Sequence, residues 1–291
     1  MRHNPVMKPL GIIAGSGPIP LMLAEQCQAE GRPLFIAGII GAASREITLF
    51  PHQWVGIGAV GALMRALRQH ACEEVVFIGA VRRPDLRYLK LDWGGMRFLP
   101  RYARAALGGD DQLLRALVHE FERHGFKVTG AHEVLADICA PAGILGMVQP
   151  STDDQADIAR ALNVARQLGA LDIGQGAVVC GGVVLAVEAA EGTDAMLARC
   201  AQLPQGLRAT PQTNGGGRRG VLVKLPKPGQ ERRIDMPAIG VTTLRLAAEA
   251  GLAGIAFEAG GALLVDVTAM IAEADAQGMF LIGLNGAGEN S

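Results

Sequence analysis

The segment 10–29, LGIIAGSGPIPLMLAEQCQA, decides the fold class of this protein. Its first five residues are apolar, as in a buried strand, and residues 19–29 have the length and composition of a helix. Gly15-Ser16-Gly17 forms a short turn between them. A buried strand, a tight turn and a helix open a βαβ unit, so the segment predicts a Rossmann-like parallel sheet.

The rest of the N-terminal half repeats this alternation of strand and helix. Strand-like apolar runs lie at 34–40 and 75–78, and helical patterns lie at 60–69 and 111–124. Such alternation is typical of a doubly wound α/β sheet. We therefore expect an N-terminal α/β domain over residues 1–135.

The C-terminal half predicts a second α/β domain, over residues 171–291. Its expected strands lie at 177–187, 221–225, 255–257, 263–265 and 280–284, with helices after Thr193 and over 242–250. Between the domains, residues 141–150 contain two prolines and no sustained period, as in a connecting segment. Ser151 and Asp154 then form a capping box ahead of a helix that we expect to link the domains across 136–170.

Composition narrows the class of protein. Aromatic residues make up only 4% of the 291 residues and charged residues 19%, which favours an α/β core of small aliphatic side chains. A net charge of −1 argues against a nucleic-acid partner. The apolar runs have the length of strands, which is too short for a membrane span, and the first ten residues lack the apolar core of a signal peptide. The five cysteines form no C-x-x-C pair, and their odd number fits a reducing compartment. We expect a cytoplasmic protein.

Gly15, Ser16 and Gly17 are the first candidate site residues. A helix N-terminus after a strand offers backbone N–H groups to a phosphate, although a tight turn that requires glycine is an equal alternative. A nicotinamide dinucleotide site would need a third glycine, and an acidic residue where the second strand ends at Ile40-Gly41. Both are missing, so an NAD-dependent oxidoreductase is disfavoured.

Two further candidates follow in the N-terminal half. Arg83 lies just after the strand 75–78, where a guanidinium could bind a diphosphate at the carboxyl edge of the sheet. Asp110 and Asp111 precede the next helix, as N-caps or as metal ligands. A solvated loop pair remains the alternative for the arginine.

Two polar clusters follow strands of the C-terminal half. Glu188, Glu191, Thr193 and Asp194 come after the strand 177–187. Lys224, Lys227, Arg233 and Asp235 come at and after the strand 221–225. Carboxylates beside lysines suit Mg²⁺-assisted phosphoryl chemistry, because the cations offset the charge of the reacting phosphate. Loose surface salt bridges are the alternative.

Taken together, the motifs resemble a known family. The strings are IIAGSGPIP (12–20), RPD (83–85), GDD (109–111), GAHEV (130–134), DIGQG (172–176), VEAAEGTD (187–194), KPGQ (227–230) and RIDMP (233–237). Their order and spread over nearly the whole chain resemble the LpxI family of UDP-2,3-diacylglucosamine pyrophosphatases.

The resemblance implies a Mg²⁺-dependent hydrolase of lipid A synthesis, with two domains that close over UDP-2,3-diacylglucosamine and release 2,3-diacylglucosamine 1-phosphate and UMP. The family's catalytic aspartate matches Asp235. With it we expect Lys224 and Lys227 to be catalytic, and Asp235, Glu191 and Asp194 to hold Mg²⁺. The expected substrate-binding residues are Gly15, Ser16, Gly17, Arg83, Asp110, Asp111, Gln175, Gly176, Glu188, Thr193 and Arg233.

The expected partners are a lipid-linked nucleotide sugar as substrate and, through peripheral contact, the inner membrane. A homo-oligomer is compatible with the sequence. A non-catalytic protein that binds a nucleotide sugar or lipid is the second hypothesis. Release of UMP from the substrate in the presence of Mg²⁺ distinguishes it from the hydrolase.

Overall fold

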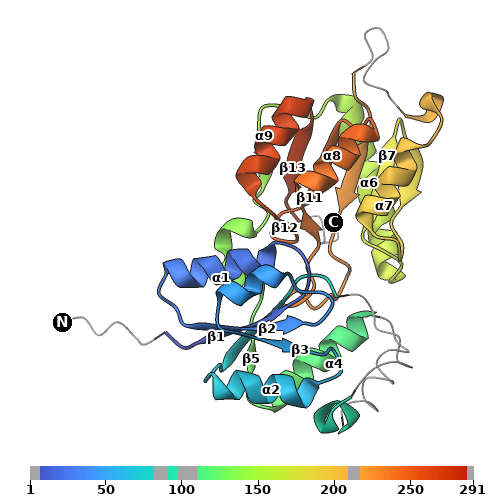
Figure 1. The fold of residues 1–291 in the computed structure, drawn as a ribbon. Coiled ribbons are helices and arrows are strands. Elements are labelled where there is room, and N and C mark those ends of the chain that lie inside the picture. Colours follow the sequence, from blue (N-terminus) through green and yellow to red (C-terminus); the bar gives the residue numbers. More distant parts are fainter. Residues whose placement is uncertain (1–6, 82–90, 98–109, 209–216, 287–291) are drawn as a thin grey trace. The chain divides into compact units, whose positions relative to one another are not determined.

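The computed structural model describes residues 7–81, 91–97, 110–208 and 217–286 of the 291-residue chain (Figure 1). The chain forms two compact units. Unit 1 comprises Met1–Ala136 and Glu231–Asp235, and unit 2 comprises Asp137–Gln230 and Met236–Ser291. The C-terminal part of the chain therefore contributes one short segment to unit 1.

Unit 1 is built on a parallel sheet of five strands in the order β3-β2-β1-β4-β5, which confirms the predicted Rossmann-like domain. The strands are β1 (Leu10–Ala14), β2 (Leu34–Ile39), β3 (His52–Val55), β4 (Glu74–Ile78) and β5 (Lys127–Val128). Helix α1 (Ile19–Ala29) covers one face, and α2 (Val60–Gln69) and α4 (Asp110–Arg123) cover the other (Figure 1). The short strands β3 and β5 were not predicted.

The core of unit 1 depends on close packing between α2, α4 and the sheet. Phe121 of α4 is fully buried and meets Phe77 edge-on, with ring centroids 4.9 Å apart. Gly11 of β1 has no room for a side chain, because a Cβ there would lie 2.5 Å from a methyl group of Leu67. The aromatic ring of Phe121 thus fills the space between α4 and the sheet. The absence of a side chain at Gly11 lets α2, which carries Leu67, pack closely on β1.

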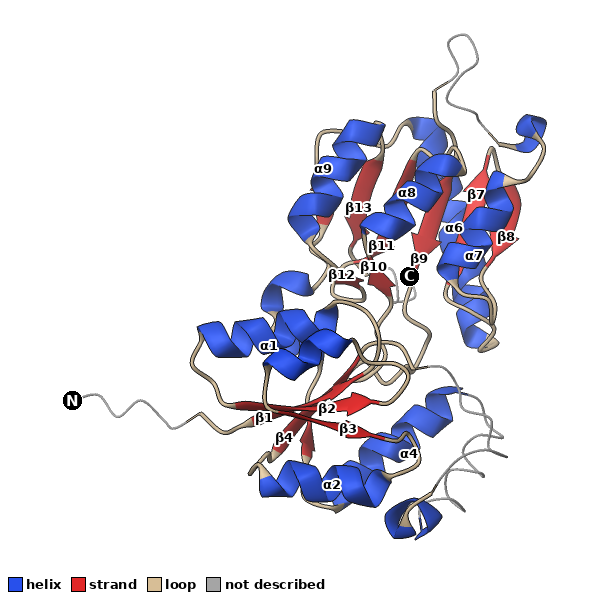
Figure 2. Cartoon of the chain, viewed as in Figure 1, coloured by secondary structure: helices blue, strands red, loops and turns tan. Residues whose placement is uncertain are grey.

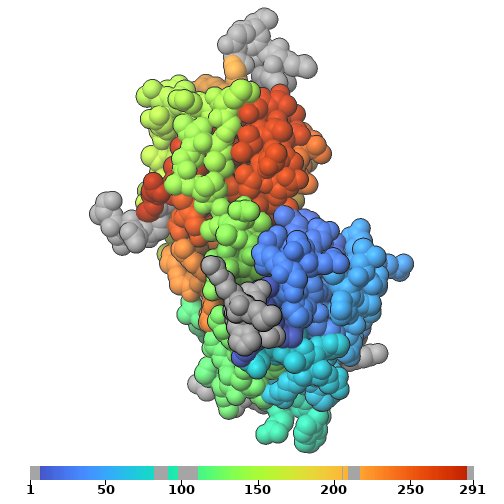
Figure 3. Space-filling view, turned by 90° about the vertical axis from the view of Figure 1, so that its left-hand side faces the viewer, coloured from blue at the N-terminus to red at the C-terminus, as the bar shows by residue number. Residues whose placement is uncertain are grey.

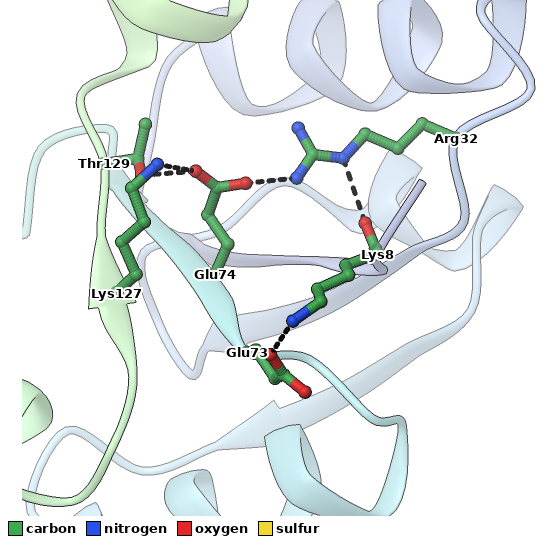
Figure 4. Close-up of polar contacts among 6 residues, drawn as sticks. All are labelled: Lys8, Arg32, Glu73, Glu74, Lys127 and Thr129. Atoms are coloured by element: carbon green, nitrogen blue, oxygen red, sulfur yellow. Dashed lines mark hydrogen bonds and ion pairs between the residues drawn. The ribbon is translucent and has the colours of Figure 1, made fainter. Parts of the chain in front are cut away.

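A polar cluster ties together the amino ends of the unit 1 strands (Figure 4). The Glu74 carboxylate accepts hydrogen bonds from Lys127 Nζ at 2.8 Å, from Thr129 Oγ1 at 2.6 Å and from Arg32. Burial by itself would raise the pKa of Glu74, but these hydrogen bonds outweigh it and lower the pKa to about 2. The carboxylate is therefore ionised in the folded protein and joins the starts of β2, β4 and β5.

Unit 2 contains a mixed sheet of six strands in the order β6-β13-β11-β9-β7-β8. The strands are β6 (Gly143–Leu145), β7 (Gly176–Cys180), β8 (Val183–Val187), β9 (Val221–Lys224), β11 (Gly254–Glu258) and β13 (Phe280–Leu284). β9, β11 and β13 are parallel, whereas β7 is antiparallel to both of its neighbours. Two short strands, β10 (Ala238–Ile239) and β12 (Leu263–Leu264), form a separate pair. The predicted second α/β domain is confirmed.

Helices cover both faces of the unit 2 sheet (Figure 2). The helices are α6 (Thr152–Ala170), α7 (Thr193–Ala201), α8 (Val241–Glu249) and α9 (Val267–Gln277). Val178 and Leu222 face the core shared with α7, α8 and α9, whereas Val179 and Val223 face α6. Figure 3 looks onto the edge of this unit, with α6 in yellow-green and α9 in red on its two sides. The helix expected to link the domains is thus a layer of unit 2.

Helix α6 starts where the sequence predicts, whereas the segments before and after it differ from the prediction. Ser151 and Asp154 form the predicted capping box. The apolar run 177–187 is a hairpin and not one strand, because Gly181 and Gly182 turn the chain with φ of 57° and 74°. Asp157 of α6 accepts hydrogen bonds from both glycine N–H groups, at 2.8 and 2.7 Å. Within the expected connector, β6 pairs with β13.

None of the helices in the described ranges combines the length and apolar character needed to cross a bilayer.

Candidate active site

One edge of the unit 2 sheet gathers the candidate residues of the C-terminal half. β8, β9 and β11 run in the same direction, so their carboxyl ends reach this edge, and β7 begins there. Lys224 ends β9, Glu188 follows β8, and Gly176 opens β7 opposite Lys224. Ligands of open α/β sheets bind outside the carboxyl ends of the strands, which makes this edge the candidate active site.

Three buried side chains at this edge form a hydrogen-bonded chain. The Lys224 ammonium donates to Thr193 Oγ1 at 2.7 Å and to the Ala238 carbonyl at 3.3 Å. The Thr193 hydroxyl donates to Glu188 Oε1 at 2.8 Å. Each of the three residues is 6–7% exposed. A buried cation and a buried anion are thus held in place through one hydroxyl group.

Two glycines allow Glu188 to take this position. A Cβ on Gly176 would lie 2.6 Å from Glu188 Oε2, and a Cβ on Gly174 would lie 2.0 Å from the Glu188 carbonyl oxygen. Glu188 Oε2 and Gln175 Oε1 are both buried and have no hydrogen-bond partner among the described residues. The predicted residues Gln175, Gly176, Glu188, Thr193 and Lys224 therefore lie together at one edge of the sheet.

The two other acidic candidates of this region have protein partners. Glu191 is exposed and pairs with Arg199 at 2.8 Å. A backbone hydrogen bond within Glu191 and the bond from Arg199 lower the pKa of its carboxyl group. Asp194 Oδ1 accepts from Thr243 Oγ1 at 3.2 Å. Within the part of the chain that the structure describes, no group of three or more His, Cys, Asp or Glu side chains could hold a metal ion.

Lys227 lies in a loop that is fastened to the end of α6. Its Nζ donates to Asp172 Oδ1 at 2.7 Å, and its backbone N–H donates to Gln230 Oε1 at 2.8 Å. Gly169 of α6 lies under the loop, since a Cβ there would come within 3.0 Å of Pro228. The loop that leads to residues 231–235 thus starts from a fixed position in unit 2.

The segment Glu231–Asp235 belongs to unit 1 and is anchored there by Arg233. The guanidinium binds Glu231 through two bonds of 2.8 Å and Glu122 of α4 at 2.6 Å. The hydrogen bond with Glu231 is the main cause of a raised pKa of Arg233. Ile234 packs against the unit 1 core, and Asp235 follows, partly exposed. Arg233 was expected to bind substrate. In the structure its guanidinium instead binds two carboxylates, close in sequence to the candidate catalytic residue Asp235.

The turn between β1 and α1 uses most of its backbone groups internally. The N–H groups of Gly15 and Ser16 donate to the carbonyls of Ile78 and Ala80, at 2.8 and 2.9 Å. A Cβ on Gly15 would lie 2.4 Å from the Gly79 carbonyl oxygen, so close packing requires this glycine. Gly17 has a φ of 97° and open space where a Cβ would be.

The remaining predicted residues lie in or beside segments that the structure does not describe. Arg83 is outside the described residues. Asp110 and Asp111 are the first two residues of α4, at the expected loop-to-helix junction.

One buried acid at the same edge was not predicted. Glu258 ends β11, is 7% exposed, and packs against Gly261, where a Cβ would lie 2.7 Å from Glu258 Oε1. The sequence signal for it is an acidic residue directly after a buried strand, GIAF.

Comparisons with known proteins cover both units. The family model of the LpxI N-terminal domain matches residues 9–138, and that of the LpxI C-terminal domain matches residues 141–282. UDP-2,3-diacylglucosamine pyrophosphatase LpxI of Caulobacter vibrioides is 50% identical over 279 residues, which is 96% of this chain and 98% of the relative. A solved UDP-glucose 4-epimerase from Thermus thermophilus, in complex with NAD, is 15% identical, with a TM-score of 0.31. The match covers 97% of this chain and 88% of the epimerase chain. The two domain models and the full-length relative show that the chain belongs to the LpxI family.

Proposed function

We propose that the protein hydrolyses UDP-2,3-diacylglucosamine to 2,3-diacylglucosamine 1-phosphate and UMP, by attack of water on the α-phosphorus. The carrying observation is 50% identity, over 96% of the chain, to a protein named as the pyrophosphatase for this substrate. The bond between the α-phosphorus and the bridging oxygen breaks, and the new oxygen enters UMP. Such a step belongs to the synthesis of lipid A.

We assign the charge-stabilising role at the diphosphate to Lys224 and Lys227, with Asp235 as the metal-dependent catalytic residue. Lys224 is supported by its fixed position, since Thr193 and the Ala238 carbonyl hold its ammonium. A positioned cation stabilises the charge that develops on a reacting phosphate, because it does not reorganise during the reaction. Asp235 is supported by the motif match and by the anchored segment that carries it.

Mg²⁺ is the cofactor that we propose. Mg²⁺ usually keeps several waters and binds one or two carboxylates together with substrate phosphates, so a cage of three acidic side chains is not required. Asp235, which is partly exposed, fits such a ligand, and the further ligands that we propose are Glu191 and Asp194, which pair with Arg199 and Thr243. When bound, the ion would neutralise charge on the phosphate oxygens.

Substrate contacts are proposed at both units. In unit 1 they involve the turn Gly15, Ser16 and Gly17 together with Arg83, Asp110 and Asp111, and in unit 2 the edge formed by Gln175, Gly176, Glu188 and Thr193. For Arg233 we propose an anchoring role in place of substrate binding, because two carboxylates already engage its guanidinium. Peripheral contact with the inner membrane would give access to a substrate that carries two acyl chains.

Hydrolysis in ¹⁸O-labelled water tests the proposed function. We expect release of UMP that carries the label, with activity lost on chelation of divalent cations and restored by Mg²⁺. Label in 2,3-diacylglucosamine 1-phosphate would instead place the attack on the β-phosphorus. Binding of the substrate without any UMP would favour the non-catalytic binding protein, and a change in NADH absorbance with the substrate would favour an oxidoreductase.

A further inference from the structure

Unit 1 exposes a small group of large apolar side chains on and beside the helical turn 93–97. Trp93 is 73% exposed, Met96 47% and Ile57 38%. Arg97 ends the turn and is exposed as well. We call Ile57, Trp93, Met96 and Arg97 the Trp93 patch. Tryptophan is usually mostly buried, so a side chain exposed to this extent indicates a binding surface.

The turn is attached to the start of α2 through the carboxylate of Asp92. Asp92 accepts hydrogen bonds from the N–H groups of Gly61, Ala62 and Gly95, at 3.2, 2.6 and 2.7 Å. Helix α2 has no side-chain cap of its own, and Asp92 satisfies its first turn. In Figure 1 the turn is the short teal-green helix near α2.

Two glycines bring the turn close to the loop before α2. A Cβ on Gly95 would lie 2.2 Å from the Gly58 carbonyl oxygen, and a Cβ on Gly94 would lie 2.6 Å from Gly61. Because this side of the turn is occupied by backbone contacts, its larger side chains, Trp93 and Met96, are left in solvent. Their exposure therefore follows from how the turn is attached.

The sequence around Trp93 has an excess of basic residues. Asp92 directly precedes the turn, and its carboxylate faces the N-terminus of α2, which offsets its charge. Arg97 is exposed, and Arg65 is exposed but pairs with Asp92, with 3.8 Å between Arg65 Nη2 and Asp92 Oδ2. In sequence, residues 82–104 contain seven arginine and lysine residues, two aspartates and four aromatic residues. The excess of basic residues is local, since the chain as a whole has a net charge of −1.

We propose that the Trp93 patch docks the protein on an anionic lipid membrane. Tryptophan side chains are favoured in the region between headgroups and acyl chains, where other apolar side chains are also buried, and arginine residues near an anionic surface are attracted to it. The apolar Ile57 and Met96 beside Trp93 favour lipid over nucleic acid, for which stacking and basic groups alone would suffice. The proposal rests on the proposed function in one respect: a diacylated substrate is drawn from a membrane.

Vesicle binding by the full-length protein, without substrate, tests the patch. We expect the wild type to sediment with phosphatidylethanolamine vesicles that contain about one-third phosphatidylglycerol, and far less with neutral phosphatidylcholine vesicles. The double variant Trp93→Ala/Met96→Ala should bind the anionic vesicles about tenfold more weakly. Leu49→Ala is the matched control, because Leu49 is 81% exposed in the same unit but outside the patch. It should bind as the wild type does.

Tryptophan fluorescence gives a second readout. The chain has two tryptophans, Trp54 in β3 and Trp93. Anionic vesicles should shift the emission of the wild type to the blue, and Trp93→Phe should abolish the shift while Trp54 still emits. Equal thermal stability of the variants confirms that they are folded.

The outcomes separate docking from catalysis. Unchanged vesicle binding by the double variant, or binding of the wild type to single-stranded RNA but not to vesicles, would overturn the proposal. Hydrolysis of detergent-dispersed substrate should be the same in wild type and double variant. If neither hydrolyses the substrate while vesicle binding still depends on Trp93, the proposed function fails and the docking surface stands.

Discussion

The Lys224 ammonium donates a hydrogen bond of 2.7 Å to the Thr193 hydroxyl, and both residues are buried at the candidate active site. Thr193 accepts this bond, and its own proton goes to Glu188 at 2.8 Å. A group proposed to stabilise phosphate charge is therefore positioned by a side chain that is not itself expected to react.

Replacing Thr193 by valine should disconnect Lys224 from Glu188 at nearly constant volume. Because two buried charged groups each lose a partner, we expect the free energy of unfolding to fall by about 1–3 kcal/mol. Turnover should fall more than substrate affinity, since the lysine loses its position. Urea unfolding and steady-state kinetics measure the two effects. Thr193→Ser keeps the hydroxyl and should have nearly wild-type stability and turnover. Wild-type turnover in Thr193→Val would show that Thr193 does not position the lysine.

Replacing Gly176 by alanine should displace the Glu188 side chain. The new Cβ would lie 2.6 Å from Glu188 Oε2, so the carboxylate must move and its bond to Thr193 weakens. We expect a loss of about 1–3 kcal/mol in stability together with lower turnover. Gly206→Ala is the control, because nothing lies within 4 Å of a Cβ there. Similar melting temperatures for both variants would contradict the prediction.

The Glu74 cluster should make the stability of unit 1 depend on pH. Hydrogen bonds hold the pKa of Glu74 at about 2, against 4.5 for the free group. A lowered pKa stabilises the fold at pH values above 4.5, and this contribution is lost as the pH falls from about 4.5 to about 2. It amounts to at most about 3 kcal/mol, reduced by solvent screening at this edge.

Glu74→Gln should remove much of this pH dependence, as measured by urea unfolding at several pH values. Glu73→Gln is the control, because Glu73 is 64% exposed and its pair with Lys8 lies at the surface. Parallel pH profiles for wild type and Glu74→Gln would show that the cluster does not carry the effect.

Asp235→Ala should fold, still bind UDP-2,3-diacylglucosamine, and turn it over about 10²-fold or more slowly at saturating Mg²⁺. The expected reason is loss of a group that acts on the transition state more than on the bound substrate. Single-turnover kinetics and substrate binding by calorimetry measure the two quantities. Glu188, Glu191 and Asp194 serve as comparisons. If Asp235→Ala keeps wild-type turnover while a substitution at one of these abolishes it, the catalytic assignment moves to the edge of unit 2.

Arg233→Lys distinguishes an anchor from a phosphate ligand. Lysine keeps the charge but cannot reproduce the two-bond contact with Glu231. For an anchor we expect lower stability and lower turnover with an almost unchanged KM, because the segment before Asp235 loosens. Glu122→Gln, which weakens the same anchor from α4, should act in the same direction. A raised KM with unchanged stability would instead indicate direct contact between Arg233 and the diphosphate.

The sequence determined the elements with strong local patterns. β1, α1, α2, β4 and α4 lie within a residue of their predicted bounds, because apolar period and glycine turns are local signals. The ordered motifs also identified the family. The strands β3 and β5 were missed because they are short, and β5 has two residues. The net charge of the whole chain, −1, did not indicate the excess of basic residues in the sequence around Trp93, because acidic residues elsewhere in the chain balance it.

Only the tertiary structure decided which residues meet. Glu188, Thr193 and Lys224 come together because the Gly181-Gly182 turn folds one apolar run into a hairpin, whose antiparallel strand β7 returns beside β9. Residues 231–235 likewise join unit 1 through Ile234 and the bonds of Arg233, although they follow strands of unit 2. Both depend on pairing between segments far apart in the chain, which no local pattern encodes.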